Sequence, residues 1–167
     1  MERWIWMWKG VWNDLGNPDF SSKSTMTWNY LNSHPKTNVV FWSWCGEFFS
    51  ASSANVDMYL SLMDSFEVDY HQVVFVSMTG HLDGTGLSGN LNQWNNQIRA
   101  YCRAHDKVLF DFADIESYDP DGNEYLSRGA DNGCNYDNWQ HNWARAGRTN
   151  MMKGWTGVSA VQRKPDR

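Results

Sequence analysis

Two short apolar runs separated by an amphipathic segment constrain the fold of this chain more than any other feature of its sequence. Val73–Met78 is rich in β-branched residues, and Val108–Phe112 is a second apolar run of strand length. Between them, Asn92–Ala104 carries its apolar residues at helical spacing. A helix that connects two buried strands is typical of a parallel pair, so we expect a strand–helix–strand unit here.

The preceding part of the chain extends this unit. Asn38–Trp44 is a continuous apolar and aromatic run, as expected of a strand that is buried on both faces. Ala54–Val68 has its apolar residues on one helical face. A shorter helix is expected from Ser24 to Leu31, ended by Pro35. The order from 38 to 112 is therefore strand, helix, strand, helix, strand.

The length of 167 residues allows one domain with a substantial core. We expect a single α/β domain over residues 1–167, with 1–11 and 147–167 as irregular tails. From Tyr118 onward the sequence is rich in Asp, Asn and Gly and has no sustained period, which predicts loops.

The composition excludes two classes of partner. A net charge of −5 with only 14 basic residues argues against a nucleic-acid surface, which needs a basic stripe. No apolar run approaches the length of a membrane span, and Met1–Trp12 lacks the cleavage site of a signal peptide.

The 11 tryptophans fit either platforms that stack on sugars or a core filled by large rings.

Three cysteines leave an odd number for pairing. If the protein is exported, a bridge between Cys102 and Cys134 is expected, with Cys45 as a buried thiol. The alternative is three reduced, buried thiols in a cytosolic protein.

Acidic and histidine side chains follow all three predicted strands. The carboxyl ends of parallel strands meet at one edge of a sheet, where open α/β folds bind their ligands. We therefore expect these side chains to gather around a single concavity. The four expected to share the concavity are Glu47, His81, Asp83 and Asp114, while Asp111 and Glu116 also fall at this edge.

A family resemblance covers about residues 12–140. The segment NNQIRAYCRAHDKVLFDFADI resembles the late part of the SGNH/GDSL hydrolase fold, in which a helix leads into a strand with a terminal Asp. FWSWCGE, MTGHLDGTG and DFADIESYDPDGN resemble a branch of bacterial exported proteins often found beside fibronectin type III modules. The resemblance implies a three-layer fold with a short parallel sheet in flavodoxin-like order, and an extracellular or periplasmic location.

The chain departs from the family in its motifs. It has no Gly-Asp-Ser block to supply the nucleophilic serine, and Cys45-Gly46-Glu47 stands where a Gly-x-Asn-Asp block is expected. Asp137 and His141 are spaced one residue too far apart for the closing Asp-x-x-His. We expect a truncated or diverged member.

The resemblance implies a hydrolase of carbohydrate esters or related glycans, and three residues are candidates for catalysis. His81 lies in a glycine-flanked loop and is the candidate base, Asp83 its orienting acid, and Glu47 a polar contact at the same edge. The alternative is that His81 has a structural role only and bonds a backbone carbonyl. Two further readings are acid–base chemistry by paired carboxylates and a metal held by His81, Asp83 and Asp114.

A non-enzymatic alternative is a catalytically inactive module that binds glycans. Trp44, Trp94 and Trp139 would then be stacking platforms, with acids bonding the sugar hydroxyls. In either reading the candidate substrate contacts are Trp44, Trp94, Asp114 and Glu116.

Asp119, Asp121 and Asn123 place oxygen ligands two residues apart around Gly122, which resembles the first half of a calcium loop. Because Ala130 occupies the twelfth position, the loop is not an EF-hand. The alternative is an ordinary Asx-rich turn, and no other cofactor is expected.

Deleting residues 1–11 is expected to lower solubility or to cause self-association. Without the family's first strands, Asn38–Trp44 would lie at an open sheet edge, and Met1–Trp12 is the segment best placed to cover it. Size-exclusion chromatography tests this expectation. An unchanged, folded monomer would show that the segment covers nothing.

Overall fold

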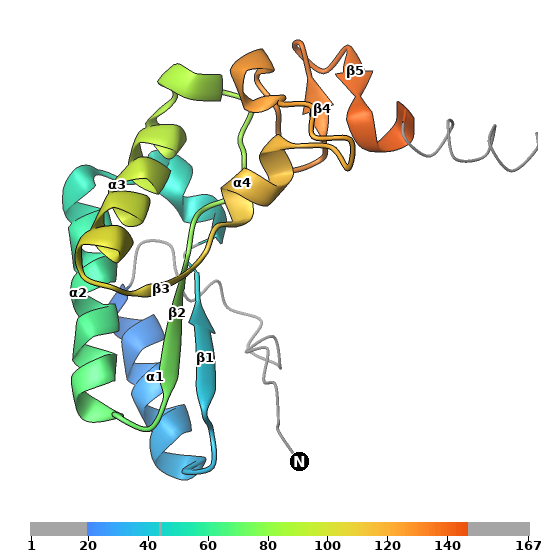
Figure 1. The fold of residues 1–167 in the computed structure, drawn as a ribbon. Helices are drawn as coiled ribbons and strands as arrows, with labels where there is room; N and C mark the ends of the chain where they lie inside the picture. Colours follow the sequence, from blue (N-terminus) through green and yellow to red (C-terminus); the bar gives the residue numbers. More distant parts are fainter. Residues whose placement is uncertain (1–19, 44, 147–167) are drawn as a thin grey trace, which may run out of the picture.

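A three-stranded parallel sheet with helices packed against it forms the body of the protein (Figure 1). The computed structural model describes residues 20–43 and 45–146. The predicted α/β fold with a short parallel sheet is confirmed. In chain order its main elements are α1 (Phe20–Ser33), β1 (Val39–Trp42), α2 (Ser53–Asp69), β2 (Val74–Met78), α3 (Asn90–Ala104) and β3 (Val108–Phe110).

The three strands lie side by side in chain order, β1-β2-β3. Val39 is in register with Val74, and Val76 with Val108, so the shared side-chain faces run across the whole sheet. Right-handed crossovers between strands in consecutive order place their helices on the same face of the sheet. Figure 1 shows α2 and α3 together on one side, with α1 beside α2.

The core lies between this sheet face and the helices. Trp42, fully buried on β1, stacks on Tyr59 of α2 with ring centroids 5.4 Å apart and an interplanar angle of 8°. Its indole nitrogen donates to Thr27 Oγ1 of α1 over 3.2 Å. Phe66 packs edge-on against Trp42 and stacks on Phe75. Ring packing thus joins the sheet to α2, and the Trp42 indole nitrogen joins it to α1.

The opposite sheet face is apolar but open among the described residues. Phe41, Val74 and Val108 are 37%, 49% and 50% exposed. Phe41 and Phe110 meet across the sheet with centroids 6.0 Å apart, and Val76 between them is buried. Of the three layers expected, the described residues form two.

Among the described residues, the first strand lies at an edge of the sheet, as expected. Within the described part of the chain, β1 pairs only with β2. The strand spans Val39–Trp42, shorter than the predicted Asn38–Trp44. The segment Met1–Trp12, proposed above to cover this edge, lies outside the described residues.

The helices are longer than the sequence pattern indicated. α1 spans Phe20–Ser33 and ends just before Pro35, as expected. α2 begins one residue before the predicted range because Ser52 forms a capping box with Asn55. α3 begins at Asn90, and short 3₁₀ turns occur at Cys45–Ser50, Gly86–Ser88 and Leu126–Arg128.

Two predictions are wrong in part: the third strand, expected over Val108–Phe112, and the loops expected from Tyr118 onward. β3 ends at Phe110, because Asp111 caps a short helix, α4 (Phe112–Ser117), by accepting from Asp114 N. Further on, β4 (Asn135–Tyr136) and β5 (His141–Asn142) form a small antiparallel ribbon. A second apolar cluster supports this region; its buried members are Leu82, Ala113, Tyr125 and Ala130.

The expected bridge between Cys102 and Cys134 is not formed, and both are free thiols. Cys102 lies on α3 and is buried in the core. Cys134 lies in the loop before β4, with a left-handed backbone (φ 65°). The two thiols belong to different parts of the fold, which sequence spacing does not reveal.

No helix in the described part of the chain is long and apolar enough to cross a membrane.

Replacing Tyr59 with phenylalanine is expected to lower the free energy of unfolding by about 1–3 kcal/mol. The buried Tyr59 hydroxyl donates to Trp42 O (2.6 Å) and accepts from Met78 N (3.0 Å), so its loss leaves two backbone groups of adjacent strands unpaired. Urea unfolding of Y59F measures the change. Y118F, at an exposed position, is the control, and equal effects in the two variants would refute the argument.

Candidate functional site

The carboxyl ends of β2 and β3 are joined by a hydroxyl at the edge of the sheet. Thr79 Oγ1 donates to Asp111 Oδ1 over 3.1 Å and accepts from Ala113 N over 2.9 Å. Thr79 directly follows β2, while Asp111 and Ala113 begin α4. The two segments that carry the predicted site residues are therefore fixed to each other.

An ion pair holds the same junction to α3. Arg99 donates to both oxygens of Asp111, through Nε (2.7 Å) and Nη2 (2.8 Å). Burial tends to raise the pKa of Asp111, but the bonds and charge of Arg99, with smaller contributions from Asp114 N and Thr79, hold it below its usual value. Asp111 is thus a fixed anion that organises the edge.

The loop after Thr79 is held by a buried amide. Asn95 Oδ1 accepts from Gly80 N (2.8 Å), and Asn95 Nδ2 donates to Gly80 O (3.2 Å). A Cβ at position 80 would lie 2.9 Å from Leu91 Cδ1 and 3.0 Å from Phe48 Cδ2, so glycine permits this close approach. The backbone is consequently fixed just before His81.

His81 is paired with Glu116, four residues into α4. His81 Nδ1 lies 2.8 Å from Glu116 Oε1, and Leu82 N donates to Glu116 Oε2 over 2.8 Å. The Glu116 side chain is only 12% exposed. Because a carboxylate accepts at Nδ1, that nitrogen carries the proton of the neutral ring, and Nε2 is the basic nitrogen.

The expected orienting role of Asp83 is corrected by this geometry. Asp83 is exposed, and its Oδ1 accepts from the backbone N (3.0 Å) and Oγ1 (2.6 Å) of Thr85, closing a turn. Glu116, expected as a substrate contact, holds the imidazole instead. A sequence signal existed: Phe112 and Glu116 are four residues apart and share one face of a helix, and both contact His81.

The remaining predicted contacts are placed as follows. Asp114 is exposed on the first turn of α4. Trp94 is half-buried and packs against the main core, so the structure assigns its ring to packing. Trp44 and the side chain of Glu47 lie outside the described residues, and their roles stay predictions.

A row of aromatic rings leads from the open sheet face to His81. Phe41 contacts Phe110, Phe110 stacks on Phe112 at 5.8 Å, and Phe112 meets the His81 ring edge-on at 4.7 Å. The row crosses from β1 to α4 on the face that the described helices leave open. An apolar surface therefore borders the imidazole.

The calcium candidate has the geometry of an Asx turn. The Asp119 carboxylate accepts from Asp121 N (3.0 Å), Asn123 N (2.9 Å) and Tyr125 Oη (2.9 Å). The side-chain and backbone bonds from Asn123 are the main cause that lowers the pKa of Asp119. These donors point their hydrogens at the oxygens that a cation would need, which favours the turn over a metal site. Within residues 20–43 and 45–146 no cluster of three metal-ligating side chains occurs.

Among the described residues near this edge, three serines and one cysteine are not activated by their surroundings. Ser77 and Ser117 are buried, and Ser117 Oγ donates to Ala113 O over 2.6 Å. Burial, followed by the negative charges of Glu116 and Asp131, raises the pKa of the Cys134 thiol and keeps it protonated at neutral pH. Ser88 is exposed on the turn before α3.

No family model matches the chain, and neither the curated proteins nor the solved structures contain a significant match. The fold and the geometry around His81 are therefore the basis on which function is argued.

Asp111→Asn is expected to destabilise the protein at pH 7 by about 1.5–3 kcal/mol, the range for hydrogen bonds to charged groups. Because folding lowers the pKa of Asp111, its contribution is present above the unfolded value of about 4 and is lost as the pH falls through the folded value. The difference between wild type and D111N should therefore shrink in acid. Denaturant unfolding between pH 3 and pH 7 checks this, with the exposed Asp121→Asn as control; a constant difference would contradict it.

Proposed function

We propose that this chain is a hydrolase domain that acts on carbohydrate esters or related glycans, with His81 as the general base. The observation that carries the proposal is the pairing of His81 with the poorly exposed Glu116 at the carboxyl edge of a parallel sheet. Open α/β folds use this edge for their ligands, and a carboxylate that orients an imidazole is the recurring arrangement behind activated nucleophiles.

Glu116 and His81 have different roles in the proposed ester cleavage. Glu116 fixes the ring through Nδ1–H, so that Nε2 accepts a proton from an attacking water molecule as the water oxygen bonds to the ester carbonyl carbon. The resulting imidazolium is stabilised by the adjacent carboxylate. His81 then returns the proton to the leaving alcohol oxygen as the carbon–oxygen bond breaks, which regenerates the neutral ring.

The aromatic row supports the same substrate class. Phe112 lies edge-on to His81, and Phe110 extends the apolar surface beyond it. Acyl groups and the C–H faces of sugar rings both pack on such surfaces.

The resemblance to the SGNH/GDSL hydrolases also supports ester cleavage. From the resemblance to exported bacterial proteins we propose an extracellular or periplasmic location.

Turnover of p-nitrophenyl acetate and of acetylated xylan tests the proposal. His81→Ala should lower kcat/KM by about 10²–10⁴-fold, the usual contribution of a general base. Glu116→Gln should cause a smaller loss and change the pH profile, because the ring loses its ionic partner.

Asp83→Asn is the matched control, since its carboxylate closes a turn with Thr85 and does not contact the imidazole. It should keep near wild-type activity. A parent protein that releases no product above the rate of H81A would refute the hydrolase. Retained glycan binding in that case would favour the non-catalytic module instead.

A further inference from the structure

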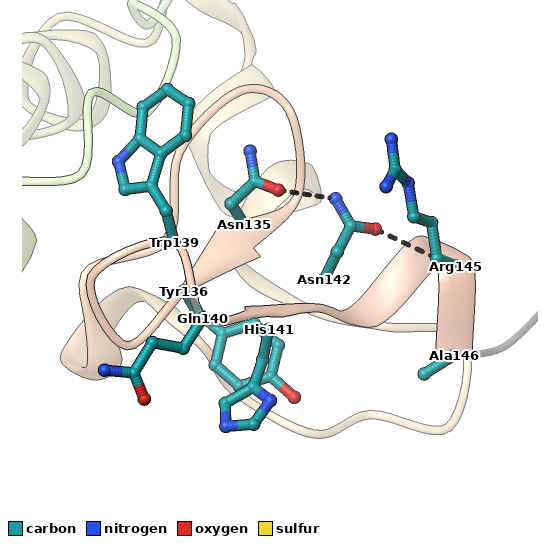
Figure 2. A pocket seen from close by; sticks show the side chains of 8 residues that line it. All are labelled: Asn135, Tyr136, Trp139, Gln140, His141, Asn142, Arg145 and Ala146. Carbon is teal, nitrogen blue, oxygen red and sulfur yellow. Dashed lines mark hydrogen bonds between the residues drawn. The ribbon is translucent and has the colours of Figure 1, made fainter.

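A shallow concavity of about 340 Å³ lies on the ribbon formed by β4 and β5 (Figure 2). Its most prominent member is Trp139, whose side chain is 74% exposed, the highest value among the exposed large apolar side chains of the described residues. The segment that leads into the ribbon lies beside the His81 loop, since Asn132 N donates to Leu82 O and Gly84 N donates to Ala130 O. The concavity uses none of the residues assigned above to ester cleavage.

The backbone at Trp139 is in a conformation that bulky residues avoid. Asn138 and Trp139 have φ values of 54° and 68°, and Gln140 N donates to Asp137 O over 3.3 Å. Two central residues with positive φ and this hydrogen bond are features of a type I′ turn, whose second central position normally holds glycine. An exposed indole gains little packing here, so stability alone does not explain its presence.

The turn that presents Trp139 is held rigidly. Arg128 forms an ion pair with Asp137, with Nε and Oδ1 3.1 Å apart, and Asp137 N donates to Arg128 O over 2.9 Å. The Arg128 guanidinium also lies 4.3 Å from the centre of the Tyr136 ring. The backbone that carries the indole is thus already ordered before a ligand binds, which lowers the entropy cost of binding.

Polar side chains accompany the indole on the same side of the ribbon. In Figure 2 the side chains of Asn135, Trp139, Asn142 and Arg145 extend to one side, away from Tyr136 and His141. Asn142 Nδ2 donates to Asn135 Oδ1 over 2.8 Å, and Asn142 Oδ1 accepts from Arg145 N over 2.9 Å. Asn135 Nδ2 donates to Asp131, and Asn142 Nδ2 also donates to Gly133 O over 2.7 Å, so both NH₂ groups are used within the ribbon. Each amide oxygen accepts one bond here and can accept a second from a ligand.

We propose that this concavity binds a carbohydrate, with one pyranose ring stacked on Trp139 and its hydroxyls donating to the side-chain oxygens of Asn135 and Asn142. A sugar ring presents an apolar C–H face and a rim of hydroxyl donors, which matches an indole beside amide oxygens that can accept. The net charge of −5 opposes nucleic acid. A concavity lined mostly by polar side chains, with Trp139 as its one highly exposed apolar residue, lacks the apolar centre of a protein interface. The site stands on its own geometry and needs no turnover at His81.

Isothermal titration of the full chain with cellohexaose and with xylohexaose tests the site. At least one of these probes should bind the parent, and Trp139→Ala should weaken its binding about tenfold or more, equivalent to about 1.4 kcal/mol. Trp139→Tyr should restore most of the affinity, because it restores an aromatic face. Met58→Ala, which removes a 51% exposed apolar side chain on α2, is the control and should bind as the parent does.

Trp139→Gly separates binding from folding. Glycine adopts the left-handed conformation at no steric cost, so this variant should have a Tm equal to or above that of the parent and still lose binding. Failure of the parent to bind either oligosaccharide, or equal affinity in W139A, would overturn the carbohydrate site. Hydrolysis of p-nitrophenyl acetate is read in parallel: loss in H81A with binding retained supports both proposals, whereas binding without turnover in the parent removes only the hydrolase.

Discussion

The carboxylate of Asp111 is the point on which the edge of the sheet depends. It accepts hydrogen bonds from Arg99 on α3, from Thr79 after β2 and from the backbone of Asp114 on α4. Through these bonds one side chain ends β3, starts α4 and sets the distance between two loops. Glu116 reaches His81 only because α4 begins where Asp111 caps it.

The periodicity of residues 38–112 predicts the order of strands and helices, because apolar spacing reports which side of an element is buried. It does not report which face of the sheet a neighbour covers. A continuous apolar run predicted burial on both faces of the first strand, yet Phe41 is exposed while Trp42 is buried. α4 escaped prediction because six residues are too few to show a helical period.

The sequence predicts the position of His81 in the candidate site but not its partner. Topology places His81 at the carboxyl end of a strand, but its partner follows from three-dimensional packing. Asp83 is the nearest acid along the chain, and local turn bonding to Thr85 takes its carboxylate; Glu116 comes from 35 residues further on. Composition likewise gives the number of tryptophans and does not separate Trp42, in the core, from Trp139, on the surface.

The left-handed backbone of Trp139 has a consequence for the stability reserve of the whole chain. A domain of ordinary size is stable by about 5–15 kcal/mol, and one left-handed residue with a side chain forgoes about 1–2 kcal/mol of that margin. The rest of the fold, through the ring packing around Trp42 and the bonds of Asp111, must supply the difference. Selection for thermal resistance alone therefore favours glycine at position 139. If tryptophan persists there when stability and function are selected together, the exposed ring contributes to function.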